Sequence, residues 1–109
     1  MNQFFPEVKK IEYRGPESKD PLSFRHYNPE EIVLGKKMAD HLRFAVCYWH
    51  TFKGLGDDPF GGPTMIRNYN QSSEPMQAAK DTMHAAFEFF TKLGVNFWCF
   101  HDRDIAPEA

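Results

Sequence analysis

The stretch Arg43-Phe44-Ala45-Val46-Cys47-Tyr48-Trp49 decides the fold prediction, because it is mostly apolar and does not alternate between apolar and polar residues. Such a run is typical of a strand covered on both faces, as in a parallel sheet. Periodicity alone does not separate it from a buried helical segment. A second run of the same kind, Val95-Asn96-Phe97-Trp98-Cys99-Phe100, follows further along the chain.

A helix is predicted between these two runs. It starts around Ser73 to Pro75, and Gly94 stands where it should end. Its expected buried stripe consists of Ala79, Met83, Ala86, Phe87, Phe90 and Leu93. The order strand, helix, strand with a crossover of this length predicts a parallel β-α-β unit. Two parallel strands leave two open edges, so the pattern indicates the opening quarter of a larger α/β fold.

The first part of the chain is predicted to be an extended arm over residues 1–27, in which the apolar Phe4-Phe5 pins the arm onto a larger body. A first helix is predicted to begin near Asn28, which can cap it in an Asn-x-x-Glu box. The apolar face of this helix would hold Ile32, Gly35, Met38, Ala39 and Leu42. The chain thus divides into an arm and helix, 1–42, and the β-α-β unit, 43–109.

Composition excludes several classes of protein. The 109 residues include 13 Lys+Arg and 15 Asp+Glu, so no basic face for nucleic acid is expected. No apolar run approaches the about 18 residues of a membrane span, and the N-terminus lacks a secretory signal. Cys47 and Cys99 lie in apolar runs and are expected to be reduced, buried thiols of a cytoplasmic protein. The five histidines show no zinc-module spacing, so no metal site is expected within the chain.

The candidate site residues stand where the two predicted strands end. Sites in α/β folds form beyond the carboxyl ends of parallel strands, so Trp49 and His101 are candidates for one mouth. Asp104 can reach a ring nitrogen of His101, fix its tautomer and leave the other nitrogen for proton transfer. On spacing alone, Asp104 can instead cap the next helix beside a surface histidine, and Trp49 can be a core or rim residue. Phe60, in a stiff turn of the long loop 50–73, either projects or packs under its own loop.

Three ordered motifs resemble the N-terminal part of xylose isomerase, in its longer-chain class. They are Arg43-Phe44-Ala45-Val46-Cys47-Tyr48-Trp49-His50-Thr51, Asp58-Pro59-Phe60-Gly61-Gly62-Pro63-Thr64 and Phe100-His101-Asp102-Arg103-Asp104-Ile105-Ala106-Pro107-Glu108. The resemblance covers nearly the whole chain, including an arm like residues 1–40. It implies a (β/α)₈ TIM barrel, of which this chain is the incomplete N-terminal quarter, assembled as a homotetramer in the cytoplasm.

The resemblance also implies an activity. The family interconverts D-xylose and D-xylulose, and D-glucose and D-fructose more slowly, with two divalent cations (Mg²⁺, Mn²⁺ or Co²⁺) that polarise the sugar oxygens. His101 matches the histidine that meets the sugar ring oxygen and assists ring opening, and Asp104 matches the carboxylate that orients it. Trp49 matches an indole that lines the sugar pocket. Phe60 matches a phenylalanine that enters the pocket of a neighbouring subunit.

The metal ligands and the catalytic lysine of the family come from later strands, so no residue of this chain is assigned to a metal. We therefore expect a segment that supplies the ring-opening histidine and is inactive alone. One alternative is a non-catalytic sugar-binding module that uses Trp49 and Phe60. Another is an assembly fragment whose open strand edges drive association. The preference for pentose or hexose and the identity of the cation stay open, because the deciding residues lie elsewhere.

Overall fold

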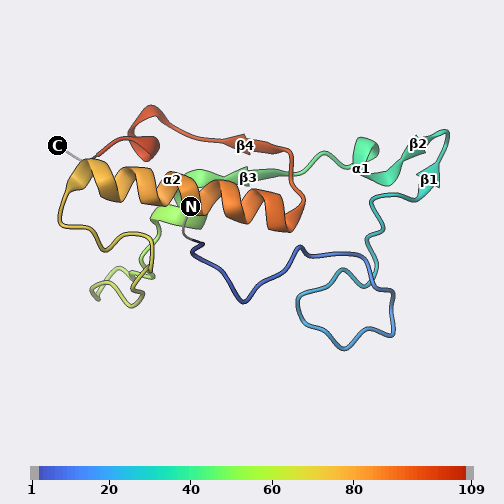
Figure 1. Cartoon of the computed structure of the whole chain (residues 1–109), viewed down its shortest axis with the longest axis horizontal. Coiled ribbons are helices and arrows are strands. Elements are labelled where there is room, and N and C mark those ends of the chain that lie inside the picture. The colour runs from blue at the N-terminus through green and yellow to red at the C-terminus, as the bar shows by residue number, and fades with distance from the viewer. Residues whose placement is uncertain (1–2, 108–109) are drawn as a thin grey trace.

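The computed structural model describes residues 3–107 and contains a parallel strand pair flanked by one long helix (Figure 1). Strands β3 (Ala45–Cys47) and β4 (Phe97–Cys99) pair in parallel, with Val46 in register with Trp98. Helix α2 (Pro75–Leu93) connects the two strands and runs alongside them. The predicted parallel β-α-β unit is confirmed.

Helix α2 begins and ends where the sequence predicts. Pro75 occupies its first turn, where a missing backbone N–H costs no hydrogen bond. Gly94 ends it in the left-handed conformation, with φ of 80°, and its N–H donates to the carbonyl of Phe90 at 2.9 Å. A residue without a Cβ takes this conformation at little cost, which explains why the helix stops there.

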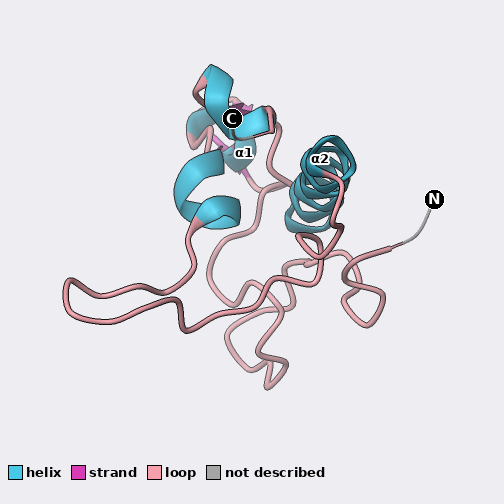
Figure 2. Ribbon diagram, turned by 90° about the vertical axis from the view of Figure 1, so that its left-hand side faces the viewer, coloured by secondary structure: helices cyan, strands magenta, loops and turns pink. Residues whose placement is uncertain are grey.

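Figure 2 looks along α2, which lies to one side of the strand pair. The core forms between this helix and the face of the strand pair that carries Val46 and Trp98. Its buried apolar residues are Val46, Tyr48, Phe52, Tyr69, Ala85, Ala86 and Phe90. Aromatic rings make most of these contacts, for example Phe52 with Phe90 at 5.7 Å and Phe90 with Trp98 at 5.5 Å between centroids. Phe87, expected in the buried stripe, is 46% exposed, although its ring still packs against Trp98 at 5.4 Å.

The opposite face of the strand pair is open, contrary to the prediction of strands covered on both faces. Ala45, Phe97 and Cys99 lie exposed there, since successive side chains of a strand point to opposite faces. The described residues place their one long helix on the other face only. The expectation of buried thiols is therefore wrong for Cys99 and holds only partly for Cys47, which is half-buried. Both thiols are free.

The predicted helix near Asn28 is wrong. Strands β1 (Ile32–Val33) and β2 (Lys36–Lys37) form an antiparallel hairpin there, and the only helix is α1 (Met38–His41). The hairpin turn places Leu34 at φ of 50° and Gly35 at φ of 81°, both outside the helical region. The Asn28 side chain does accept a backbone N–H, that of Glu30 at 3.1 Å, but it closes a local turn and not a helix.

The described residues before β1, 3–31, form an arm that runs beneath α2 toward the hairpin (blue to cyan in Figure 1). Phe4 and Phe5 pack against the core, as the pinned arm predicted. The radius of gyration is 16.6 Å, whereas a compact domain of this length has about 13 Å. The described residues therefore do not close into a globule. None of their helices combines the length and the apolar character that crossing a membrane requires.

Candidate functional site

The ends of β3 and β4 bring two rings into contact. Trp49 opens a π-helical turn (Trp49–Lys53) that follows β3, and His101 follows β4. The centroids of the two rings are 4.3 Å apart, with 46° between their planes. The parallel pairing of β3 and β4 explains this contact, because the residues that follow the two strands leave the sheet at the same end. Trp49 is half-buried and is not one of the buried core residues.

His101 is bound to Asp104 in two ways. The carboxylate oxygen Oδ2 of Asp104 accepts the backbone N–H of His101 at 2.7 Å and lies 3.2 Å from its ring nitrogen Nδ1. The side chain of Asp104 is 12% exposed, whereas that of His101 is 64% exposed. His101 is the N-cap of the short 3₁₀ helix Asp102–Ile105, and Asp104, its third residue, closes a capping box with it. The capping role that spacing alone allowed for Asp104 is thus present together with its contact to the imidazole. An ionised carboxylate accepts a hydrogen bond from Nδ1–H, so Nδ1 keeps the proton and Nε2 is the acceptor of the neutral ring.

Phe60 does not join this pair. It is 99% exposed at the tip of the loop between the π-helical turn and α2, and no ring contact within residues 3–107 links it to Trp49 or His101. Its backbone N–H donates to Oδ1 of Asp58 at 2.6 Å, in a tight turn that projects the ring. The interpretation of Phe60 as a residue packed under its own loop is wrong.

The rings of Trp49 and His101 line an open surface. Three hollows among the described residues, of about 350 to 550 Å³, are lined by other residues. The nearest in sequence lies between Phe52, Thr82 and Ala106. None of these three hollows reaches the pair of rings at the strand ends.

Tyr48 is a residue that the sequence analysis did not single out. It is fully buried beside Trp49, and its hydroxyl has no hydrogen-bond partner within residues 3–107. Burial, with smaller contributions from Tyr69 and from the charge of Asp104, raises the pKa of Tyr48 to about 12. The one available signal was its phenol group inside an otherwise apolar run.

Metal ligands are not gathered in this part of the chain. Among residues 3–107, no three His, Cys, Asp or Glu side chains lie close enough together to hold an ion. The carboxylate of Asp104 is engaged by His101, which makes it a poor ligand. The residues present therefore do not fit the two-cation centre that the resemblance implies.

A β-α-β unit with an indole and a histidine–carboxylate pair at its strand ends is an α/β arrangement suited to proton transfer on a small polar molecule. Among known proteins, the chain is similar to xylose isomerases. The chain is 58% identical over 107 residues to the xylose isomerase of Caldanaerobacter subterraneus, which is 98% of this chain and 24% of that protein. It is 56% identical over 109 residues to that of Thermoanaerobacterium saccharolyticum, covering 25% of it, and 61% identical over 106 residues to that of Sinorhizobium fredii, covering 24% of it.

The resemblance to xylose isomerase is thus confirmed over nearly the whole chain. The chain spans about a quarter of the length of these relatives. No family model matches the chain. Divalent cations and a TIM barrel are features of the relatives' family, and the described residues contain neither a metal site nor a closed barrel.

Proposed function

We propose that this chain is the N-terminal part of an aldose–ketose isomerase of the xylose isomerase type, acting on D-xylose and, more slowly, D-glucose in the cytoplasm. Within a complete (β/α)₈ barrel, the segment 43–109 would form the first β-α-β unit behind the arm of residues 1–42. The observation that carries the proposal is the contact of Trp49 with His101, whose ring Asp104 holds. The identity to xylose isomerases over nearly the whole chain supports it.

His101 is the proposed catalytic residue for opening the sugar ring. With Nδ1 bound to Asp104, Nε2 takes the proton of the anomeric hydroxyl as the bond between C1 and the ring oxygen breaks. The same proton then passes to the ring oxygen, which leaves an open-chain aldehyde and a neutral imidazole. The indole of Trp49 covers the apolar C–H face of the sugar and keeps water from the imidazole.

The remaining parts of the proposed activity need groups other than the pair of Trp49 and His101. The cations would polarise the sugar oxygens for the hydride shift, and this chain supplies none of their ligands. Phe60, at the exposed tip of its loop, would reach the pocket of a neighbouring subunit in a homotetramer. The chain alone would therefore bind sugar weakly and isomerise nothing.

A chimaera tests this proposal. These 109 residues would replace the matching segment of the Thermoanaerobacterium saccharolyticum xylose isomerase, to which they are 56% identical. We expect the chimaera to convert D-xylose to D-xylulose in the presence of Mn²⁺, and the chain alone to form none. A folded but inactive chimaera would contradict the assigned function, and sustained xylulose formation by the chain alone would contradict the placement of the metal centre outside it.

A further inference from the structure

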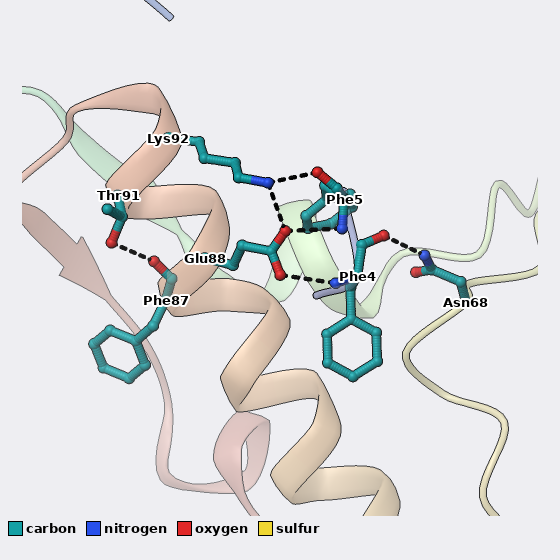
Figure 3. Close-up of polar contacts among 7 residues, drawn as sticks. All are labelled: Phe4, Phe5, Asn68, Phe87, Glu88, Thr91 and Lys92. Atoms are coloured by element: carbon teal, nitrogen blue, oxygen red, sulfur yellow. Dashed lines mark hydrogen bonds and ion pairs between the residues drawn. The ribbon is translucent and has the colours of Figure 1, made fainter. Parts of the chain in front are cut away.

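Two charged side chains of α2 bind the backbone of the N-terminal arm (Figure 3). The carboxylate of Glu88 accepts the N–H of Phe4 through Oε1 and the N–H of Phe5 through Oε2, each at 2.8 Å. Lys92 donates to the carbonyl of Phe5 and lies 2.9 Å from Oε2 of Glu88. The pair thus contacts donors and an acceptor of the same short segment.

This pair is largely removed from water. The side chain of Glu88 is 14% exposed and that of Lys92 is 18% exposed. Burial alone would raise the pKa of Glu88, but the N–H groups of Phe4 and Phe5 and the ammonium of Lys92 outweigh it, so the pKa lies below its ordinary value. Charge-assisted hydrogen bonds in such surroundings are stronger than those between neutral groups, and a lost partner leaves a poorly solvated charge.

The same arm residues contact the far end of the long loop that carries Phe60. Asn68 donates through Nδ2 to the carbonyl of Phe4 at 2.6 Å. The rings of Phe4 and Phe5 pack edge-on against Tyr69, with centroids 6.4 and 6.5 Å away. Tyr69 is buried, and its hydroxyl donates to the carbonyl of Phe52 at 3.0 Å. The arm therefore lies between α2 and the end of the loop and contacts both.

The loop has few other anchors among the described residues. Arg67 donates to the carbonyl of Gly54, at 3.1 and 2.9 Å, and closes the base. Above this closure, Met65 donates to the carbonyl of Leu55 at 2.9 Å, and Phe60 projects at the tip. The tip continues from this base, and the arm contacts the base through Asn68 and Tyr69.

We propose that Phe4 and Phe5 act as a strap, held by Glu88 and Lys92, that fixes the base of the Phe60 loop. Glu88 is thereby a positioning residue for Phe60, acting through the arm and Asn68. The entry of Phe60 into the pocket of an adjoining subunit rests on the proposed function. The strap itself is a property of this chain and is tested without any activity.

Amide-resolved hydrogen exchange of the 109-residue chain tests the strap. In Glu88→Gln, we expect the amides of Phe4 and Phe5 and those of Met65 and Asn70 to exchange at least about tenfold faster, while amides in the middle of α2 stay protected. Glu74→Gln, an exposed glutamate just before the same helix, is the matched control and should change none of them. A second variant, Asn68→Ala, should speed exchange at Asn70 and leave Phe4 protected.

Each other outcome overturns the proposal. If Glu88→Gln releases Phe4 and Phe5 but leaves Met65 and Asn70 unchanged, the arm is held without positioning the loop. If neither group of amides responds, or if Phe4 and Phe5 are unprotected in the unmodified chain, there is no strap. If Glu88→Gln speeds exchange throughout α2, only Asn68→Ala tests the contact between the arm and the loop. An unchanged exchange rate of the Asn70 amide in Asn68→Ala then overturns the proposal. These hydrogen-exchange results do not depend on isomerase activity, so an inactive chimaera would leave the test of the strap unchanged.

Discussion

Tyr48 shows how closely the core and the candidate site are connected at the scale of single residues. Its ring packs against Phe52 at 5.2 Å and Trp98 at 5.8 Å, directly behind Trp49. The hydroxyl has no partner in the described part of the chain, and a buried polar group in that state costs stability. Burial also disfavours the ionised phenolate, which raises the pKa of Tyr48 to about 12.

We predict a loss of stability at alkaline pH that depends on Tyr48. The unfolded phenol ionises near its ordinary pKa of 10.0 and the folded one near 12, so the free energy of unfolding should fall between these values. Tyr48→Phe has no phenol at this position, so its free energy of unfolding should not show this fall. By pH 12, the free energy of unfolding of the variant should have risen relative to that of the parent by about 2–3 kcal/mol. Urea unfolding of both proteins across the pH range measures it. Parallel curves would show that Tyr48 ionises normally in the folded state.

We also predict that Asp104→Asn impairs the proposed catalysis more than the fold. An amide can still accept the N–H of His101, but it no longer selects the tautomer in which Nε2 accepts a proton. In the chimaera, kcat should fall about 100-fold or more. Asp102→Asn, a carboxylate bonded to the N–H of Arg103, is the matched control and should stay within about threefold of the parent. Equal effects of the two substitutions would remove Asp104 from the site.

The site was predictable to different extents from the sequence. The contact of His101 with Asp104 follows from local spacing, since a residue three positions later at a helix start reaches back to the first. The contact of His101 with Trp49 follows only from parallel pairing, which the two apolar runs indicate. The exposure of Phe60 was not predictable, because nothing local decides whether a long loop packs on itself. Glu88 carried no signal beyond an i,i+4 pair with Lys92.

At the scale of elements, α2 and the hairpin show why one helix prediction succeeded and the other failed. In α2, the proline at the start, the glycine at the end and the apolar stripe all agree. Near Asn28, a helix-like cap and spacing compete with a turn at Leu34 and Gly35, where both residues take positive φ. The turn prevails, since two such residues cannot continue a helix. Backbone angles of this kind are not visible in apolar periodicity.

The turn itself yields a prediction. Leu34 is 92% exposed at a φ of 50°, a conformation that asparagine tolerates better than leucine. Leu34→Asn should therefore slow exchange of the Met38 amide, which donates to the carbonyl of Glu31 at 2.7 Å, by about two- to fivefold. Ile66→Asn, at an equally exposed residue without positive φ, serves as the control. Faster exchange in Leu34→Asn would show that the side chain of Leu34, and not the turn, holds the hairpin.

The molecule as a whole leaves one face of its strand pair open and extends over 49 × 35 × 29 Å. Phe97 and Cys99 are exposed on that face, and an open strand edge readily pairs with other chains. In the proposed barrel, later elements would cover the open face and pair with the open strand edge. The elongated shape and the open face therefore agree with a segment whose packing is finished by further elements.

We predict that the isolated chain self-associates through this open face. Light scattering at micromolar concentrations should give a mass above that of a monomer, and Phe97→Glu should lower it. Met76→Glu, at a comparably exposed residue on α2, is the control and should not. A monodisperse monomer would contradict the prediction and would also exclude the assembly-fragment alternative.

In the proposed enzyme, the indole of Trp49 and the imidazole of His101 border one sugar site. A crystal structure of the chimaera with D-xylose bound would show whether they do. We expect an oxygen of the sugar within about 3 Å of Nε2 of His101 and the sugar's C–H face in van der Waals contact with Trp49. A sugar bound away from either ring, or the two rings separated from their 4.3 Å contact in the complete protein, would contradict it.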